Sequence, residues 1–342
     1  MRFSSTLAAL ALAAPALARG SHYLRKIDSL LGDLGYIETP KTIAFTFWIQ
    51  LVSDKLGNQL NNVFKGKETY TILMPETQAW DEYLTSLGGN TTEIESFSQQ
   101  KWRDLFTDLY PYLFLKGALN TTAVEAGETV VLDSIKQSPV GDWPLSIAFR
   151  WESAYEPGVD ENGNFTSAVY NGTVYNEPWG AANITIPDNA VRGQVAQVIN
   201  YMPTMPKNLG ATITDLGVEG WSELTSRVSS AAALETSRNY TLLLPPSSAI
   251  STALAGSDAE LSSFVDAHLI PSRLVLSSRE QSFQLASSSS GTATGQSIVV
   301  NGVNATVVTR DVLTNGIVVH AIDRSLYNST SSSNSSVQHR EL

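Results

Sequence analysis

The sequence predicts a fold of two similar halves, each of which combines strands with helices, and three repeated features indicate it. A β-branched and aliphatic stretch that ends in a proline occurs at Tyr70–Pro75 and again at Tyr240–Pro245. Each copy is preceded and followed by apolar residues at helical spacing. Further strand-like stretches follow in the same order in both halves. Because the order is kept, we predict a tandem duplication that folds as two domains.

Helices are predicted on both sides of the two strand stretches. Apolar residues recur at helical spacing from Trp48 in the first half and from Trp221 in the second, and both runs end just before the strand. Beyond each proline, Thr77 and Ser247 are placed to begin a helix, since short hydroxyl side chains favour helix N-termini. Each half therefore predicts a helix, a strand and a second helix in succession.

The later elements also correspond between the halves. Asn171-Gly172 and Asn301-Gly302 each predict a hairpin with a type I′ turn, because Asn and Gly tolerate the positive φ angles that such a turn needs. Closing strands are predicted around Asp188 and, 123 residues later, around Asp311. The offset between the halves falls from 170 residues at the first strands to 123 here, so the first half carries insertions.

The offsets and the composition divide the chain. Residues 1–18 carry a positive n-region, a short apolar run and small residues before a cleavage point, so we predict a secretory signal peptide. Residues 19–205 are predicted as the first domain, with an aromatic-rich insertion at about 139–180, and residues 206–327 as the second. The Ser/Asn-rich end, residues 328–342, is predicted to be disordered.

Composition and charge limit the classes of function. With 42% hydrophobic residues among 342, the chain can bury the cores of two domains. Its formal net charge is −11 without basic clusters, so we expect no nucleic-acid partner. It has no cysteine, which excludes disulfides, thiolate metal sites and a cysteine nucleophile. No later stretch is apolar for the length of a bilayer and no hydrophobic tail predicts a GPI anchor, so we expect a soluble mature protein.

Asn-x-Ser/Thr sequons are frequent, and we expect several to carry N-glycans on solvent-facing loops and strand ends. They begin at Asn90, Asn120, Asn164, Asn171, Asn183, Asn239, Asn304, Asn328 and Asn334. The last four residues, His339–Leu342, resemble a His/Lys-Asp-Glu-Leu retrieval signal, but Arg340 reverses the charge that a receptor would read. We therefore predict secretion to the extracellular space and keep retention in the endoplasmic reticulum as the alternative.

Three repeated motifs resemble those of the fasciclin domain family. The first family motif reads roughly Tyr-Thr-x-Phe-Ala-Pro-Thr-x-x-Ala-Phe, and both Tyr70–Trp80 and Tyr240–Ala249 are similar to it. The family's Tyr-His motif is similar to Ala267–Arg273, where the first half has Leu113 in place of the histidine. The Asn-Gly-Val-Ile-His-Val-Ile-Asp motif is similar to Asn315–Asp323, which is one residue longer.

The resemblance covers about residues 25–327 and is fuller in the second half. In the first half, Arg192, Gln197 and Asn200 stand at the polar positions of the last motif. Membership implies an α+β fold of two tandem fasciclin-like domains, each a small β-sandwich or wedge flanked by helices. It also implies extracellular or cell-surface work, usually adhesion or matrix binding. Some fungal members resemble accessory proteins of secreted polyketide-pigment pathways.

Residues that could carry chemistry are few. Of the four histidines, His268 and His320 fall on motif positions of the second half and are the candidates for acid–base catalysis, with Asp323 near them. Isolated histidines at packing positions usually make structural hydrogen bonds, so we favour that role. The sequence has no zinc-protease, P-loop, nucleophile-elbow or Rossmann pattern. We therefore expect no metal, no cofactor and no catalysis by the chain itself.

The aromatic insertion is the second candidate site. Trp143, Trp151, Tyr155 and Trp179 offer rigid contact area for a planar ligand, a sugar or a partner protein. The same residues can instead pack the insertion onto the first domain, since a loop of this length needs a small core of its own. The sequence leaves both roles open and favours packing.

These observations predict a secreted, N-glycosylated tandem fasciclin protein that binds an extracellular protein, a glycan or an aromatic small molecule without catalysis. The alternative is an accessory or catalytic component of an extracytoplasmic fungal pathway that makes a polyketide pigment. In that case the aromatic insertion would hold a planar polyketide, and His268 or His320 would be the acid–base residue.

Overall fold

The chain forms two compact units, each discontinuous in sequence. The computed structural model describes residues 68–86, 109, 111–121, 129–151, 172–175, 181–191, 194–276 and 281–327. The first unit comprises Met1–Ala123, Tyr155–Asn171 and Ala182–Met202, and the second comprises Val124–Ala154, Gly172–Ala181 and Pro203–Leu342. Both units contain helices and strands, which confirms the predicted α+β class.

In the first unit, β1 (Tyr70–Pro75) is paired on both sides. It runs antiparallel to β2 (Phe114–Lys116) and parallel to β7 (Gln194–Ile199), and β7 runs antiparallel to β6 (Ala181–Val191). The helix α4 (Thr77–Ser86) begins directly after the strand and its following glutamate. Every residue of β1 is buried, as expected for a strand covered on both faces. The strand and the helix predicted here are confirmed.

The second unit contains a seven-stranded sheet in the order β10-β11-β12-β13-β14-β8-β9. The strands are β8 (Tyr240–Leu244), β9 (Leu269–Ile270), β10 (Gln281–Gln284), β11 (Ser290–Thr294), β12 (Ser297–Val300), β13 (Val303–Leu313) and β14 (Ile317–Ile322). Only the pair β8–β14 within this sheet is parallel. Asn301 and Gly302 join β12 to β13 with φ angles of 49° and 80°, so the predicted type I′ hairpin is confirmed.

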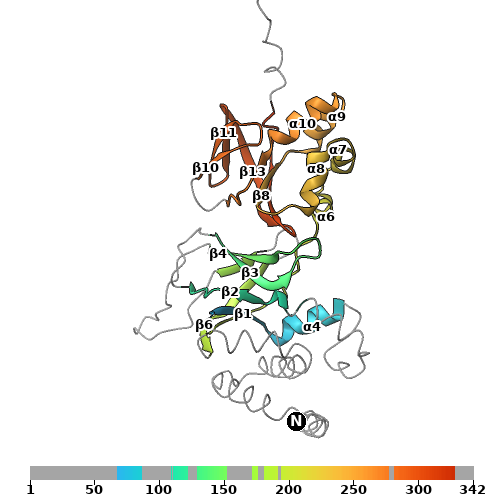
Figure 1. Ribbon diagram of the computed structural model, residues 1–342. Helices are drawn as coiled ribbons and strands as arrows, with labels where there is room; N and C mark the ends of the chain where they lie inside the picture. The colour runs from blue at the N-terminus through green and yellow to red at the C-terminus, as the bar shows by residue number, and fades with distance from the viewer. Residues whose placement is uncertain are drawn as a thin grey trace, which may run out of the picture. The chain divides into compact units, whose positions relative to one another are not determined.

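Helices lie along one side of this sheet (Figure 1). They are α6 (Leu209–Asp215), α7 (Trp221–Arg227), α8 (Ser229–Ala233), the 3₁₀ helix η5 (Leu234–Thr236), α9 (Ser247–Leu254) and α10 (Asp258–Asp266). Their apolar residues share one buried cluster with Leu242 of β8 and Val319 of β14. Leu243 belongs to a second cluster, together with Phe283, because successive strand residues point to opposite faces. The sheet therefore has two separate cores.

The helical run predicted from Trp221 is divided in the structure. Its apolar residues lie on α7 and α8, because Val228 between them adopts extended backbone with φ −117° and ψ 108°. A β-branched residue tolerates that conformation readily. By contrast, α10 begins with a capping box, in which Ser257 and Glu260 satisfy each other's main-chain N–H groups.

Three further strands of the second unit come from the middle of the chain. β3 (Thr129–Gln137) pairs antiparallel with β4 (Pro144–Trp151), and β4 pairs antiparallel with β5 (Gly172–Tyr175). β4 lies next to β13, and Ala148 is buried together with Val318. The aromatic insertion therefore includes strands β4 and β5. The domain boundaries given by the sequence stay a prediction.

The strands pair in the same register in both halves of the chain. Thr71 faces Val195 in the parallel pair β1–β7, and Thr241 faces Val318 in the parallel pair β8–β14. These residues are related by the offsets of 170 and 123 that the sequence repeat shows. The Thr71 hydroxyl donates to the Gly117 carbonyl and accepts from the Leu119 N–H. The Thr241 hydroxyl likewise donates to the Arg273 carbonyl and accepts from the Val275 N–H.

Several predicted segments lie outside the described residues and stay predictions. They are the signal peptide of residues 1–18, the helix from Trp48, the turn at Asn171 and the tail of residues 328–342. Within the ranges that the structure describes, no helix has the length and apolar character needed to cross a membrane.

Candidate functional site

His268 is fully engaged in holding the second unit together. It is 1% exposed and lies two residues beyond the end of α10. Its Nε2 atom accepts the Leu326 N–H at 2.9 Å, so Nδ1 carries the hydrogen that is donated to the Phe264 carbonyl at 2.7 Å. Burial lowers the pKa of the ring to about 4, although the bond to Phe264 opposes the shift. The ring is therefore neutral and inaccessible.

His320 has a similar structural role on β14. It is 2% exposed, and its Nδ1 atom accepts the Asp311 N–H at 3.2 Å. Its Nε2 atom then carries the hydrogen and donates it to the Val275 carbonyl at 2.7 Å. The two motif histidines do not form a pair, because Leu243 of β8 lies between them: it faces His320 and its N–H donates to the His268 carbonyl.

A carboxamide makes the same two bonds in the first unit. Gln197, on β7, accepts the Asp188 N–H through Oε1 at 3.0 Å and donates from Nε2 to the Leu119 carbonyl at 2.8 Å. Asp188 and Asp311 both have positive φ angles, of 53° and 56°. The two positions are thus built alike, with glutamine in place of histidine.

The carboxylate of Asp311 is bound by residues of β3 and β4. Arg150 Nη2 donates to its Oδ2 at 2.8 Å, and the Thr129 hydroxyl lies 3.4 Å from the same oxygen. The side chains of Arg150 and Asp311 are 3% and 1% exposed. His320 Nε2 lies 3.9 Å from the other carboxylate oxygen. Because water and substrate do not reach this cluster, its groups hold β4 against β13.

The structure places Trp143, the first of the predicted aromatic ligand residues, in a structural contact. Its indole N–H donates to the Asn315 carbonyl. Its ring packs on Gly141, where a Cβ atom would lie 1.8 Å from the ring atom Cζ3. A Cβ atom at Gly316 would lie 2.3 Å from the Ser237 carbonyl oxygen and 3.1 Å from the indole nitrogen. Glycine at both positions therefore lets the half-buried indole fit.

A small cleft lies beside this indole. It has a volume of about 30 Å³, and Asp133, Trp143, Arg238 and Asn315 are among the residues that line it. The Asn315 Oδ1 atom is buried and has no hydrogen-bond partner among the described residues. A space of this size holds a water molecule, which would satisfy that oxygen, and does not hold a planar ligand.

The other predicted ligand residues are not placed. Trp151 ends β4, but its side chain lies outside the described residues, as do Tyr155 and Trp179. A ligand role for the aromatic insertion stays a prediction. In the part of the chain that the structure describes, no three His, Asp or Glu side chains gather in a way that could hold a metal ion.

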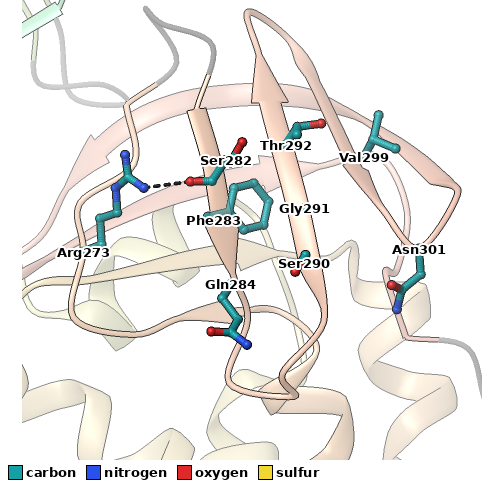
Figure 2. Close-up of a pocket in the computed structure, with 9 residues that line it drawn as sticks. All are labelled: Arg273, Ser282, Phe283, Gln284, Ser290, Gly291, Thr292, Val299 and Asn301. Atoms are coloured by element: carbon teal, nitrogen blue, oxygen red, sulfur yellow. Dashed lines mark hydrogen bonds between the residues drawn. The ribbon is translucent and has the colours of Figure 1, made fainter.

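An open hollow lies over β10, β11 and β12 (Figure 2). It has a volume of about 500 Å³. Its lining consists of Arg273, Ser282, Phe283, Gln284, Ser290, Gly291, Thr292, Val299 and Asn301. The Arg273 guanidinium donates to the Ser282 carbonyl at 2.7 Å and to the Gln281 carboxamide oxygen at 3.1 Å, so it is fixed at the edge of β10.

Apart from Arg273, neutral side chains surround this hollow on the outer face of the sheet. We call this surface the neutral face. Its outward residues alternate with buried ones and are Ser282, Gln284, Ser290, Thr292, Thr294, Ser297, Val299, Asn304, Thr306 and Val308. Eight of these ten positions supply hydroxyl or carboxamide groups, which both donate and accept hydrogen bonds, and none of the ten carries a charge. The hollow therefore suits an uncharged ligand rich in hydroxyl groups more than an ion.

Sequence reasoning missed the hollow. The signal that could have revealed it is the alternation of Ser290, Thr292 and Thr294 with Gly291 and Ala293, which is typical of a strand with one polar face. Such a pattern indicates an exposed face. It does not indicate curvature, which depends on how neighbouring strands twist.

Four of the predicted sequon asparagines are described, and all four are exposed. They are Asn120, Asn183, Asn239 and Asn304. Asn304 differs from the others because it lies on the neutral face. The sequons at Asn90, Asn164, Asn171, Asn328 and Asn334 lie outside the described residues.

The polar residues of the second unit thus define an α+β module whose histidines hold the fold. Residues 219–328 match the family model described as Fasciclin domain, which agrees with the motif resemblance of the second half. A solved structure entitled a FAS1 domain pair from the insect cell adhesion molecule fasciclin I is similar at 15% identity, with a TM-score of 0.36 over 84% of this chain and 98% of that chain. The comparison with curated proteins gives no match.

Proposed function

We propose that this protein is a secreted, N-glycosylated pair of fasciclin-like domains that acts by binding an extracellular partner and not by catalysis. The fasciclin match of residues 219–328 supports the family and the extracellular location, since fasciclin domains commonly work outside the cell. The common register of the two halves supports a second, diverged copy in the first half. Four exposed sequon asparagines support glycosylation.

The observation that carries the binding role is the contrast between the histidines and the neutral face. His268 and His320 are at most 2% exposed and have partners on both ring nitrogens. The neutral face instead presents hydrogen-bonding groups around an open hollow of about 500 Å³. Accessible polar groups recognise ligands, whereas buried and satisfied ones hold structure.

The partner that this face fits is a neutral glycan. Serine, threonine and carboxamide groups match sugar hydroxyls, which also donate and accept. The hollow has one cationic residue, Arg273, whose guanidinium is already bonded to β10. Acidic ligands would meet a chain of net charge −11 and are therefore disfavoured at low ionic strength.

The test is binding of the full-length secreted protein to immobilised neutral and acidic polysaccharides, before and after native enzymatic removal of its N-glycans. Thr292→Glu places a charge in the hollow and is expected to weaken binding to neutral glycans about tenfold or more, which is about 1.4 kcal/mol. Val308→Glu places the same charge on the same face, outside the hollow, and is the matched control. Equal affinity of the two variants, or no binding to neutral glycans, would contradict the proposal.

The polyketide-pathway alternative stays a prediction. In the described residues Trp143 is held between two glycines beside a water-sized cleft, and this observation does not favour a planar ligand there. Titration of tryptophan fluorescence with aromatic metabolites tests it. Saturable quenching that is lost in Trp151→Phe would support the alternative.

A further inference from the structure

Asn304 is the direct neighbour of a residue that lines the hollow. Across the hairpin, Asn304 of β13 faces Val299 of β12, and Val299 in turn faces Thr292 of β11. The three side chains therefore form one row on the neutral face; Figure 2 shows the two that line the hollow. Neighbouring side chains in such a row are about 5 Å apart, so Thr292 lies about 10 Å from Asn304. This distance is within reach of the first sugars of an N-linked glycan.

The side chain of Asn304 is oriented for modification. The asparagine and the third residue of its sequon, Thr306, are both exposed and point outward from the same strand. The Ser297 hydroxyl donates to Asn304 Oδ1 at 2.8 Å, which fixes the carbonyl side of the amide. The Nδ2 atom, to which a glycan is attached, is the other end of that amide.

Val299 provides a place for the sugar to pack. It is 38% exposed, although its neighbours in the row are polar. An N-acetylglucosamine ring has an apolar face and an acetyl methyl group, and burying these apolar surfaces against Val299 is favourable. The sugar hydroxyls would then meet Thr292, Ser282 and Ser290, which supply hydrogen-bond partners around the hollow.

We propose that the N-linked glycan on Asn304 lies over Val299 and covers the hollow, so that occupancy of this sequon decides whether the neutral face is open to a partner. The inference rests on the proposed function, because it takes glycosylation and the binding face from it. In the modification, Asn304 Nδ2 forms a bond to the anomeric carbon of an oligosaccharide and gives up one proton. The bond from that carbon to a lipid diphosphate breaks, and the lipid diphosphate leaves.

The experiment measures the solvent accessibility of Val299 by hydroxyl-radical footprinting of the full-length protein secreted by a eukaryotic host. Glycopeptide mass spectrometry first establishes the occupancy of Asn304. In Asn304→Gln, oxidation of Val299 is expected to rise several-fold over the glycosylated protein. Val308 is 70% exposed on the same strand as Asn304 and outside the hollow, so its oxidation is the internal standard and should not change.

Two controls keep the test independent of folding. Asn183→Gln removes an exposed sequon from β6 and should leave Val299 protected. Native trimming of the folded wild-type protein to a single sugar should keep Val299 partly protected, whereas full enzymatic removal should expose it. An unoccupied Asn304, or equal Val299 oxidation with and without the glycan, would overturn the proposal.

The footprint needs no partner and therefore separates this inference from the proposed function. The glycan could protect Val299 while the deglycosylated protein binds no neutral polysaccharide. This result would contradict the proposed partner and support the covering glycan. If wild-type protein and Asn304→Gln bound neutral polysaccharides with the same affinity, the covering role of the glycan would be contradicted and the proposed binding face would stand.

Discussion

The two halves of the chain use different side chains at one buried position and make the same hydrogen bonds with both. His320 accepts from the Asp311 N–H and donates to the Val275 carbonyl. Gln197 accepts from the Asp188 N–H and donates to the equivalent carbonyl of the first half. The position therefore needs one acceptor and one donor, which a neutral imidazole and a carboxamide both supply. A carboxamide does not transfer protons near neutral pH, so the shared role is structural.

The largest effect on the free energy of unfolding is expected at Asp311. The carboxylates of Asp188 and Asp311 have different partners, although their main-chain N–H groups make equivalent bonds to Gln197 and His320. Asp188 accepts the Thr121 N–H at 2.9 Å, whereas Asp311 accepts from the guanidinium of Arg150, which lies on β4 of the same unit as Asp311. Arg150→Met would remove the cation that contacts the buried Asp311 carboxylate, so we expect a loss of about 3–5 kcal/mol in the free energy of unfolding, measured with urea.

Two further variants test the cause of that loss. Adding Asp311→Asn to Arg150→Met removes the buried carboxylate charge and should therefore recover part of the stability. Asparagine also tolerates the positive φ angle of 56° at this position. Arg238→Met breaks an exposed pair with Asp133, at 3.5 Å, and should cost less than about 1 kcal/mol. If Arg150→Met cost no more than Arg238→Met, the buried pair would not distinguish the halves.

The next effect concerns His268, which stands where the first half has Leu113. Its folded pKa of about 4 lies below the ordinary value of 6.5, so the unfolded chain takes up a proton first as the pH falls. The stability contributed by the neutral ring is complete above about pH 6.5 and is lost between about pH 6.5 and 4. The difference between the folded and unfolded pKa of His268 corresponds to roughly 3 kcal/mol in the free energy of unfolding, which urea unfolding at several pH values measures.

His268→Leu copies the residue of the first half and serves as the comparison. It leaves the buried Leu326 N–H without its acceptor, so stability at pH 7 should fall by about 1–3 kcal/mol. It also removes the titrating group, so the difference in the free energy of unfolding between variant and wild type should decrease as the pH falls from 6.5 to 4. A difference that stays constant over this range would show that His268 does not titrate as its burial requires.

The smallest effect on the free energy of unfolding is expected at His320, where the first half has the equivalent residue Gln197. His320→Gln should keep both hydrogen bonds and change the free energy of unfolding by less than about 1 kcal/mol. His320→Leu has a similar size but removes both bonds, and it should cost more because the Asp311 N–H and the Val275 carbonyl are then left unpaired. If glutamine were as damaging as leucine, the equivalence with Gln197 would be wrong.

Sequence patterns located the elements that depend on neighbouring residues. The strand Tyr70–Pro75, the helix from Thr77 and the turn at Asn301-Gly302 all follow from local propensity, and the structure confirms each. The division of the helical run at Val228 was not predicted, because helical spacing of apolar residues continues across it. Periodicity alone does not locate a break in which the side chains stay on the same face.

The arrangement of the candidate site depended on contacts between distant residues. The bond between Trp143 and Asn315 and the pair of Arg150 with Asp311 join residues more than 150 positions apart. No local pattern encodes such pairs, so the sequence identified Trp143 as a candidate without revealing its partner. The hollow also escaped prediction, because its lining residues come from β10, β11 and β12 and from Arg273 and Asn301, and no single motif encodes that arrangement.

The absence of charge on the ten named positions of the neutral face has a consequence for self-association. Two copies of a chain with a net charge of −11 repel each other. The repulsion is weaker between surfaces on which no two groups of the same charge lie opposite each other. Copies could therefore approach through the neutral face at a low electrostatic cost, and the exposed Val299 and Val308 also add apolar surface there. A hydrated glycan on Asn304 would act there as a steric spacer, so the same modification would favour the monomer at high concentration.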